Sequence, residues 1–247
     1  VPVLRASAAV VTAVLGALLG VLATRPAVRY LGTVCECLLA TAVAASAALA
    51  VVAYDARVDV ERTEYVVIAL SFGGALALVV KLAAGRAGLG TRGVLVVVGG
   101  LLLLVLLLAY GQALTRWGSP ELADRLNTAM LHVHDRLHAT PRPLEYLLGF
   151  PALAWGVSTR GRRRQGWWGC VYGATGLALV GTTLLRRHLS LEEAGLGLGY
   201  SLLIGVVVGG VLVAGDRLLS GSRGRRARRP DDTGVERREP GRFAPLI

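Results

Sequence analysis

Long apolar segments separated by short polar ones dominate this chain. Apolar segments of about 18 residues or more with few or no charges are typical of membrane spans, because about 20 helical residues cross a ~30 Å hydrocarbon core. The backbone must satisfy its own hydrogen bonds in lipid, so each segment is predicted to be an α-helix. Seven segments follow this pattern, the fifth of them short: 6–23, 31–53, 65–84, 93–114, 144–157, 167–185 and 194–215.

The fifth segment, 144–157, leaves two interpretations open. As a helix it covers about 21 Å, less than the core thickness, and Pro151 is also compatible with a re-entrant loop. A re-entrant loop, however, would move the basic residues that follow it to the outer side. Arg142 and Arg160 can instead snorkel to the two surfaces from the ends of a short span. We therefore predict that this segment spans the membrane.

The connection between the fourth and fifth segments has a different periodicity. Ser119 and Pro120 form a favourable helix start, and Pro141 and Pro143 end the helix. Apolar residues recur between them at spacings of three and four, namely Leu122, Leu126, Met130, Val133 and Leu137. This pattern predicts an amphipathic helix that lies on the membrane surface or against the bundle.

The predicted fold is an all-α, polytopic transmembrane helix bundle of about seven spans in a 4+3 arrangement. Residues 1–115 form spans one to four, 116–142 the extracytoplasmic amphipathic helix, and 143–218 spans five to seven. Residues 219–247 form an Arg-rich cytoplasmic tail, which is predicted to be disordered because it is too polar to bury a core. The 4+3 arrangement fits a two-fold transporter architecture poorly.

Composition and charge agree with a membrane location. The chain has 247 residues, of which 54% are hydrophobic and 17% charged, whereas soluble domains carry about a quarter charged residues. A net charge of +11 suggests a nucleic-acid partner when taken alone. The arginines stand mainly between and after the apolar segments, however, where membrane topology requires them. We predict the lipid bilayer as a partner and no nucleic acid.

Orientation follows from the same basic residues. With a cytoplasmic C-terminus, fifteen basic residues lie inside, counted as far as Arg229, and nine lie outside. The positive-inside rule then predicts a multi-pass plasma-membrane protein with its N-terminus out and its C-terminus in. Lys81 is the only lysine and Asn127 the only asparagine, a bias that indicates a high-GC bacterium.

Three of the four histidines lie in the predicted amphipathic helix, beside an aspartate: His132, His134, Asp135 and His138. His134 and His138 are one helical turn apart, so both imidazoles can reach one ion. The set is a candidate metal or pH-sensing site on the outer face. The alternative is a solvated polar face, because such a pair without a third ligand from another element is a weak metal signal.

Glu36 is the intramembrane polar candidate, within the second segment. A carboxylate inside the membrane is costly and marks a functional position by default. Glu36 lies close enough to the segment's start for Arg25 or Arg29 to pair with it, so a structural ion pair is the alternative. Glu145, at the start of the fifth segment, is a second and weaker candidate.

Small residues spaced four apart let helix backbones approach closely in lipid. The glycines form four such pairs, namely Gly16 with Gly20, Gly169 with Gly173, Gly195 with Gly199, and Gly205 with Gly209. We predict that these pairs pack helices within the chain, with a dimer face as the alternative. The three cysteines are predicted to be reduced packing thiols.

A lipid-facing basic cluster is predicted on the cytoplasmic side, where arginines attract anionic lipid. It comprises Arg160, Arg162, Arg163, Arg164, Arg223, Arg225, Arg226, Arg228 and Arg229. The alternative is that these residues only fix the orientation.

No catalytic residue or cofactor is predicted, since the chain has neither a phosphate-binding loop nor a nucleophile elbow. The favoured function is a non-enzymatic accessory or scaffold subunit with a membrane-protein partner or self-association. The alternatives are a small transporter or permease component that uses Glu36, and an outer-face metal- or pH-sensing protein that uses the His132–His138 cluster.

Overall fold

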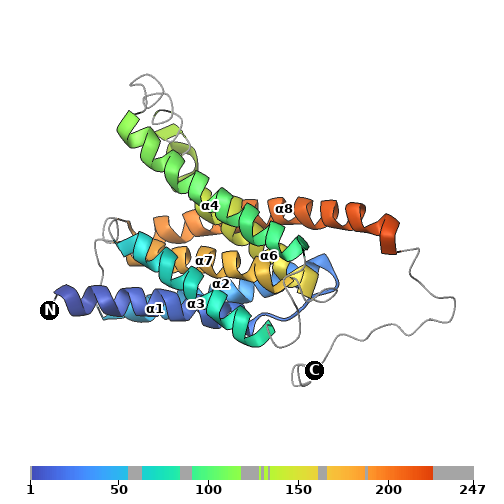
Figure 1. Ribbon diagram of the computed structural model, residues 1–247. Coiled ribbons are helices and arrows are strands. Elements are labelled where there is room, and N and C mark those ends of the chain that lie inside the picture. The colour runs from blue at the N-terminus through green and yellow to red at the C-terminus, as the bar shows by residue number, and fades with distance from the viewer. Residues whose placement is uncertain are drawn as a thin grey trace.

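The chain forms an all-α helix bundle, as the sequence predicts (Figure 1). The computed structural model describes residues 2–54, 63–83, 91–117, 128, 131–132, 134–160, 166–186 and 189–224, and no strand occurs among them. The helices are α1 (Pro2–Ala23), α2 (Tyr30–Ala53), α3 (Thr63–Ala83), α4 (Thr91–Trp117), η1 (Leu144–Gly149), α6 (Phe150–Arg160), α7 (Gly166–Leu185) and α8 (Leu191–Gly224).

Each of the seven predicted spans coincides with helical structure. Five helical segments are long and apolar enough to cross a membrane, namely Leu4–Ala23, Tyr30–Ala53, Thr63–Lys81, Gly166–Leu185 and Leu191–Leu218. The apolar part of α4, Val97–Ala109, is shorter, and η1 with α6 is short as predicted. The five long helices indicate a membrane protein, and the total of seven spans stays a prediction.

The fifth predicted span begins with a π-helical turn. The Phe150 N–H donates to the carbonyl of Glu145, five residues earlier, and Phe150 itself has helical φ and ψ angles of −67° and −39°. Helix α6 therefore continues η1 without a break. Pro151 follows directly, and in a regular α-helix its ring would clash with the carbonyl four residues before it. The wider turn of η1 relieves this clash.

Helix α7 is the centre of the bundle. All of its residues except Trp167 are buried, and it contacts α1, α2, α3, α4, η1, α6 and α8. It also has the lowest mean hydropathy of the five long helices, 1.3. A helix that is surrounded by protein tolerates threonine and glycine, because its side chains face packed neighbours and not lipid.

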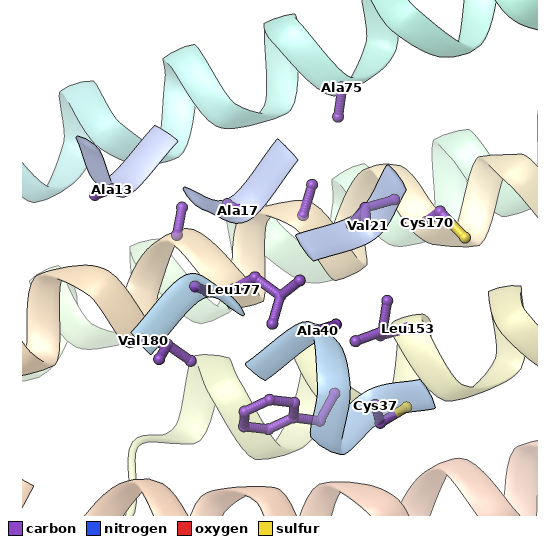
Figure 2. Packing of buried hydrophobic residues seen from close by; sticks show 14 of the residues in the cluster. Ala13, Ala17, Val21, Cys37, Ala40, Ala75, Leu153, Cys170, Leu177 and Val180 are labelled. Atoms are coloured by element: carbon purple, nitrogen blue, oxygen red, sulfur yellow. The ribbon is translucent and has the colours of Figure 1, made fainter. Parts of the chain in front are cut away.

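Small side chains let the surrounding helices approach α7 closely. Ala17 of α1 and Ala40 of α2 lie beside Leu177, which is fully buried (Figure 2), and Ala13 of α1 lies against Gly181. A Cβ on Gly173 would lie 2.9 Å from the Leu153 side chain of α6. The core is therefore filled by alanine, glycine and a few large residues in close contact.

Large apolar side chains cover the outside of the bundle. Leu19 of α1 is 57% exposed and Leu203 of α8 is 66% exposed. Contiguous apolar surface of this kind is rare on soluble monomers. It is the surface that a membrane protein presents to lipid.

Helix α4 is the least integrated of the long helices and projects from the bundle at a steep angle (Figure 1). The Tyr172 hydroxyl of α7 donates to the carbonyl of Val97, and Gly100 lies against the Tyr172 ring. Among the side chains of this helix that the structure describes, Leu104 is buried, while Leu102 and Leu106 are exposed. Tyr172 thus makes much of the contact between α4 and the central helix α7.

Two predicted segments are described only in part. Residues 128, 131, 132 and 134–137 of the predicted amphipathic helix are helical, and the rest of 119–133 lies outside the described residues. Helix α8 continues to Gly224, so 219–224 is helical where the sequence predicts a disordered tail. Residues 225–247 lie outside the described part of the chain.

Candidate functional site at one end of the bundle

A cluster of charged and hydroxyl side chains lies at the end of the bundle where α3 begins and α7 ends. Its members come from four parts of the chain that the fold brings together. We call it the charged cluster, and it consists of Glu64, Arg142, Glu145, Thr182, Thr183, Arg186 and Ser201.

Glu64, in the first turn of α3, joins two arginines. One of its carboxylate oxygens, Oε2, lies 2.8 Å from Nη2 of Arg186 and 3.3 Å from Nη2 of Arg142. The Glu64 side chain is 18% exposed, as is that of Arg142, so water only partly screens these ion pairs. Charge-assisted bonds of this kind link α3 to the segments that flank α7 and η1.

Arg142 is the centre of the charged cluster. Its Nη1 donates to the hydroxyl oxygens of Thr183 and Thr182, at 3.1 and 3.4 Å. Its backbone N–H donates to Oγ of Ser201 in α8, at 3.0 Å. A single arginine therefore connects α3, the end of α7 and α8.

Glu145 is the innermost member of the charged cluster and is fully buried. The Thr183 hydroxyl lies 2.9 Å from its Oε1 and 3.0 Å from the Leu179 carbonyl, and its single hydrogen can be given to only one of them. The Ser201 hydroxyl also faces this carboxyl, yet Oε2 is buried without a hydrogen-bond partner.

An incompletely bonded buried carboxyl costs roughly 1–3 kcal/mol. A fold retains such groups mainly where they have a function. Glu145 also lies in a π-helical turn, a feature found often at functional sites. These observations make Glu145, with Arg142, the strongest candidate for a functional residue among the described residues.

Glu36 lies at the opposite end of the bundle, apart from the charged cluster. Its Oε2 accepts a hydrogen bond from the backbone N–H of Arg25, at 2.9 Å, and its side chain is half-buried. The partner is thus the main chain of Arg25 and not the guanidinium that the sequence suggests. This contact favours the structural alternative for Glu36, because the hydrogen bond holds the connection between α1 and α2 against the start of α2.

The histidines of the candidate metal site make separate contacts. His132 Nδ1 lies 2.9 Å from the Thr128 carbonyl, and His134 Nδ1 lies 3.8 Å from Glu193 Oε1. His138 follows the helical residues with a positive φ of 52°. Within the described residues, no three His, Cys, Asp or Glu side chains are grouped closely enough to hold a metal ion. The metal site stays a prediction.

Two members of the predicted lipid-facing cluster lie within the described residues, and Arg160 is the last residue of α6. Arg223 lies in α8. The others lie outside the described residues, namely Arg162, Arg163, Arg164, Arg225, Arg226, Arg228 and Arg229.

Two ion pairs of the charged cluster were not anticipated from the sequence. Arg186 stands close in sequence to Glu192 and Glu193, but it pairs with Glu64, which is 122 residues away. Ser190 caps the start of α8, since the Glu193 N–H donates to the Ser190 hydroxyl at 3.1 Å. The sequence did carry one signal for the charged cluster. Polar residues stand at the start of α3, before η1 and at the end of α7, and the predicted topology places these three span ends on the same side of the membrane.

The lining of the hollow between α1, α3 and α7 carries no charged side chain and is mainly aliphatic. The hollow is lined by Leu18, Val21, Leu22, Ala75, Leu78, Val79, Trp167 and Cys170. This hollow therefore suits lipid tails or side chains better than a polar ligand.

No family model, curated protein or solved structure matches the chain.

Proposed function

We propose that this chain is a non-enzymatic accessory or scaffold subunit of the plasma membrane. The observation that carries the proposal is the burial of α7, which is enclosed by protein along nearly its whole length. The middle of the bundle is thus occupied by a packed helix. A protein built in this way acts by holding its helices, and those of a partner, in a fixed arrangement.

The placement of the polar groups supports this proposal over transport. Transporters bind substrates near the membrane midplane, on broken helices that line a cavity. Here the described charged side chains lie at the two ends of the bundle, and the middle of α7 is buried by the neighbouring helices. Thr175, a buried polar residue in the middle of α7, bonds to the Val171 carbonyl of its own helix at 3.2 Å.

The same proposal includes an orientation with the N-terminus outside and the C-terminus in the cytoplasm. The charged cluster then lies at the outer surface, and Arg160 with the basic segments that follow α6 and α8 lies at the inner surface. The distribution of arginines along the sequence supports this orientation.

Purification of the tagged chain from native membranes in lipid nanodiscs, with quantitative mass spectrometry, tests the proposal. We expect a second membrane protein in stoichiometric amount. A second tagged membrane protein of similar size, purified in parallel, controls for carry-over. Recovery of the chain alone, or only with its own copies, would argue against a hetero-oligomeric accessory role.

A second candidate function is proton-coupled transport through the charged cluster. The observation that favours it is the unpartnered Oε2 of Glu145. Purified protein in liposomes with an imposed proton gradient distinguishes the two. A current in the parent protein that is lost in Glu145→Gln, but kept in Glu36→Gln, would support transport and contradict the scaffold proposal.

A further inference from the structure

The connection between α1 and α2, residues 24–29, is surrounded by arginines from three parts of the chain. Arg25 and Arg29 belong to the connection itself. Arg160, at the end of α6, donates through Nη2 to the hydroxyl of Thr24.

Helix α8 adds a fourth arginine to this region. Arg217 donates through Nη2 to the carbonyl of Val28, at 3.3 Å, although 189 residues separate the two. The Ala27 N–H also donates to the Val157 carbonyl of α6, at 3.3 Å, which fixes the connection against the same end. We call the four arginines the basic end: Arg25, Arg29, Arg160 and Arg217.

The positive charge of the basic end exceeds the negative charge near it within the described residues. Glu36 accepts a backbone N–H of Arg25, and the guanidinium groups of Arg25 and Arg29 form no ion pair in this part of the chain. Four arginines against two acidic residues near this end, Glu36 and Asp216, leave two positive charges in excess. The Nε atom of Arg160 is moreover buried without a hydrogen-bond acceptor.

Aromatic residues indicate the depth of the basic end in the membrane. The Arg160 guanidinium lies over the Trp167 ring, 4.6 Å from its centroid. Tyr30, directly after the connection, donates its hydroxyl to the carbonyl of Val206 in α8. Tryptophan and tyrosine prefer the level of the lipid headgroups. The four arginines therefore lie at the depth of lipid phosphates.

We propose that the basic end binds the phosphodiester headgroup of an anionic phospholipid. Guanidinium groups match the geometry of phosphate oxygens and bind them through paired hydrogen bonds. Arg25 is half-buried and Arg29 exposed, so both can reach a headgroup at the edge of the helices. Basic sites between spanning helices recognise anionic headgroups through this chemistry. Free inorganic phosphate can accept the same hydrogen bonds from the arginines. It has no acyl chains, however, and so makes no contact with the surrounding apolar helix surface.

Native mass spectrometry of the full chain in nanodiscs tests the proposal. Three samples are compared. The first has nanodiscs of phosphatidylglycerol with phosphatidylcholine, the second has phosphatidylcholine alone, and the third has phosphatidylcholine with added inorganic phosphate. We expect retained phosphatidylglycerol in the first case, and no bound phosphate in the third. Arg25→Gln with Arg29→Gln should weaken phosphatidylglycerol retention roughly five-fold per arginine removed. The matched control is Arg5→Gln with Arg136→Gln, two exposed arginines away from the basic end.

Three results would overturn the proposal. They are equal retention of both lipids, equal retention in the parent protein and the Arg25/Arg29 variant, and binding of inorganic phosphate without enrichment of phosphatidylglycerol. If the double variant unfolds, Arg217→Gln replaces it, because this side chain is exposed and makes a single contact to Val28. Unchanged retention in Arg217→Gln would then count against the proposal.

Discussion

Gly149 of η1 and Gly176 of α7 bring two helix backbones into direct contact. A Cβ built on Gly149 would lie 2.5 Å from the Cα of Gly176, and one built on Gly176 would lie closer still to the Cα of Gly149. Neither neighbour is a flexible side chain that can move aside. This contact places the π-helical turn, and with it Glu145, directly against the central helix.

Alanine at either glycine should destabilise the bundle. Overpacking of a close contact costs roughly 1–3 kcal/mol, and here the obstacle is backbone, so we expect Gly149→Ala and Gly176→Ala at the upper end. Thermal unfolding in detergent measures the effect. Gly73→Ala is the control, because nothing lies within 4 Å of its Cβ, and it should be neutral or stabilising. Equal behaviour of the three variants would contradict the close contact.

Thr183→Val should destabilise the charged cluster, since the Thr183 hydroxyl lies between Arg142 and Glu145. Its loss leaves Glu145 Oε1 without its donor in a buried site, which costs roughly 1–3 kcal/mol. Thr175→Val is the control on the same helix, because that hydroxyl bonds only to its own helix. Unfolding measurements that rank Thr175→Val as the more harmful change would refute the bridging role.

Glu64 and Arg186 should show an energetic coupling in a double-mutant cycle. Because the Glu64 side chain is 18% and that of Arg186 33% exposed, we expect only about 0.5–1.5 kcal/mol. The unfolding free energies of Glu64→Gln, Arg186→Gln and the double variant give this value. The same cycle for Glu192 and Arg186 should be additive within experimental error. Coupling of Arg186 to Glu192 without coupling to Glu64 would contradict the ion pair between Glu64 and Arg186.

Tyr172→Phe should loosen α4 while leaving the rest of the bundle in place. The variant loses the hydrogen bond to Val97 but keeps the ring against Gly100. Loss of a bond worth about 1 kcal/mol speeds local opening roughly five-fold. Hydrogen exchange of α4 amides measures this, with Tyr200→Phe as the control. Faster exchange throughout the bundle would mean that Tyr172 has a global role.

The sequence predicted the helices well because their signal is local. Each apolar segment became a helix, and Gly16, Gly20, Gly169, Gly173, Gly205 and Gly209 all lie at close intramolecular contacts, as predicted. Gly195 and Gly199 differ, since nothing lies within 4 Å of their Cβ positions. Glycine spacing alone does not say which face of a helix has a neighbour.

The central position of α7 and the composition of the charged cluster could not be predicted in the same way. Hydropathy marks a segment as apolar, but it does not distinguish a helix that faces lipid from one that faces protein. The lower hydropathy and the threonines of α7 were the available signs. Glu64 and Arg186 are far apart in the chain, and only the packing of α3 against α7 brings them together.

Cysteine accessibility along α7 tests the central claim, that a packed helix fills the middle of the bundle. In a variant with Cys35→Ser, Cys37→Ala and Cys170→Ala, single cysteines replace Ala174 and Ala178, both 0% exposed. Membrane vesicles of both orientations are treated with a small, charged thiol reagent, and Thr140→Cys, at an exposed position, serves as the labelled control. We expect Thr140→Cys to react from one side and the two α7 cysteines from neither. Labelling of Ala174→Cys or Ala178→Cys would reveal a water-filled path and contradict the account.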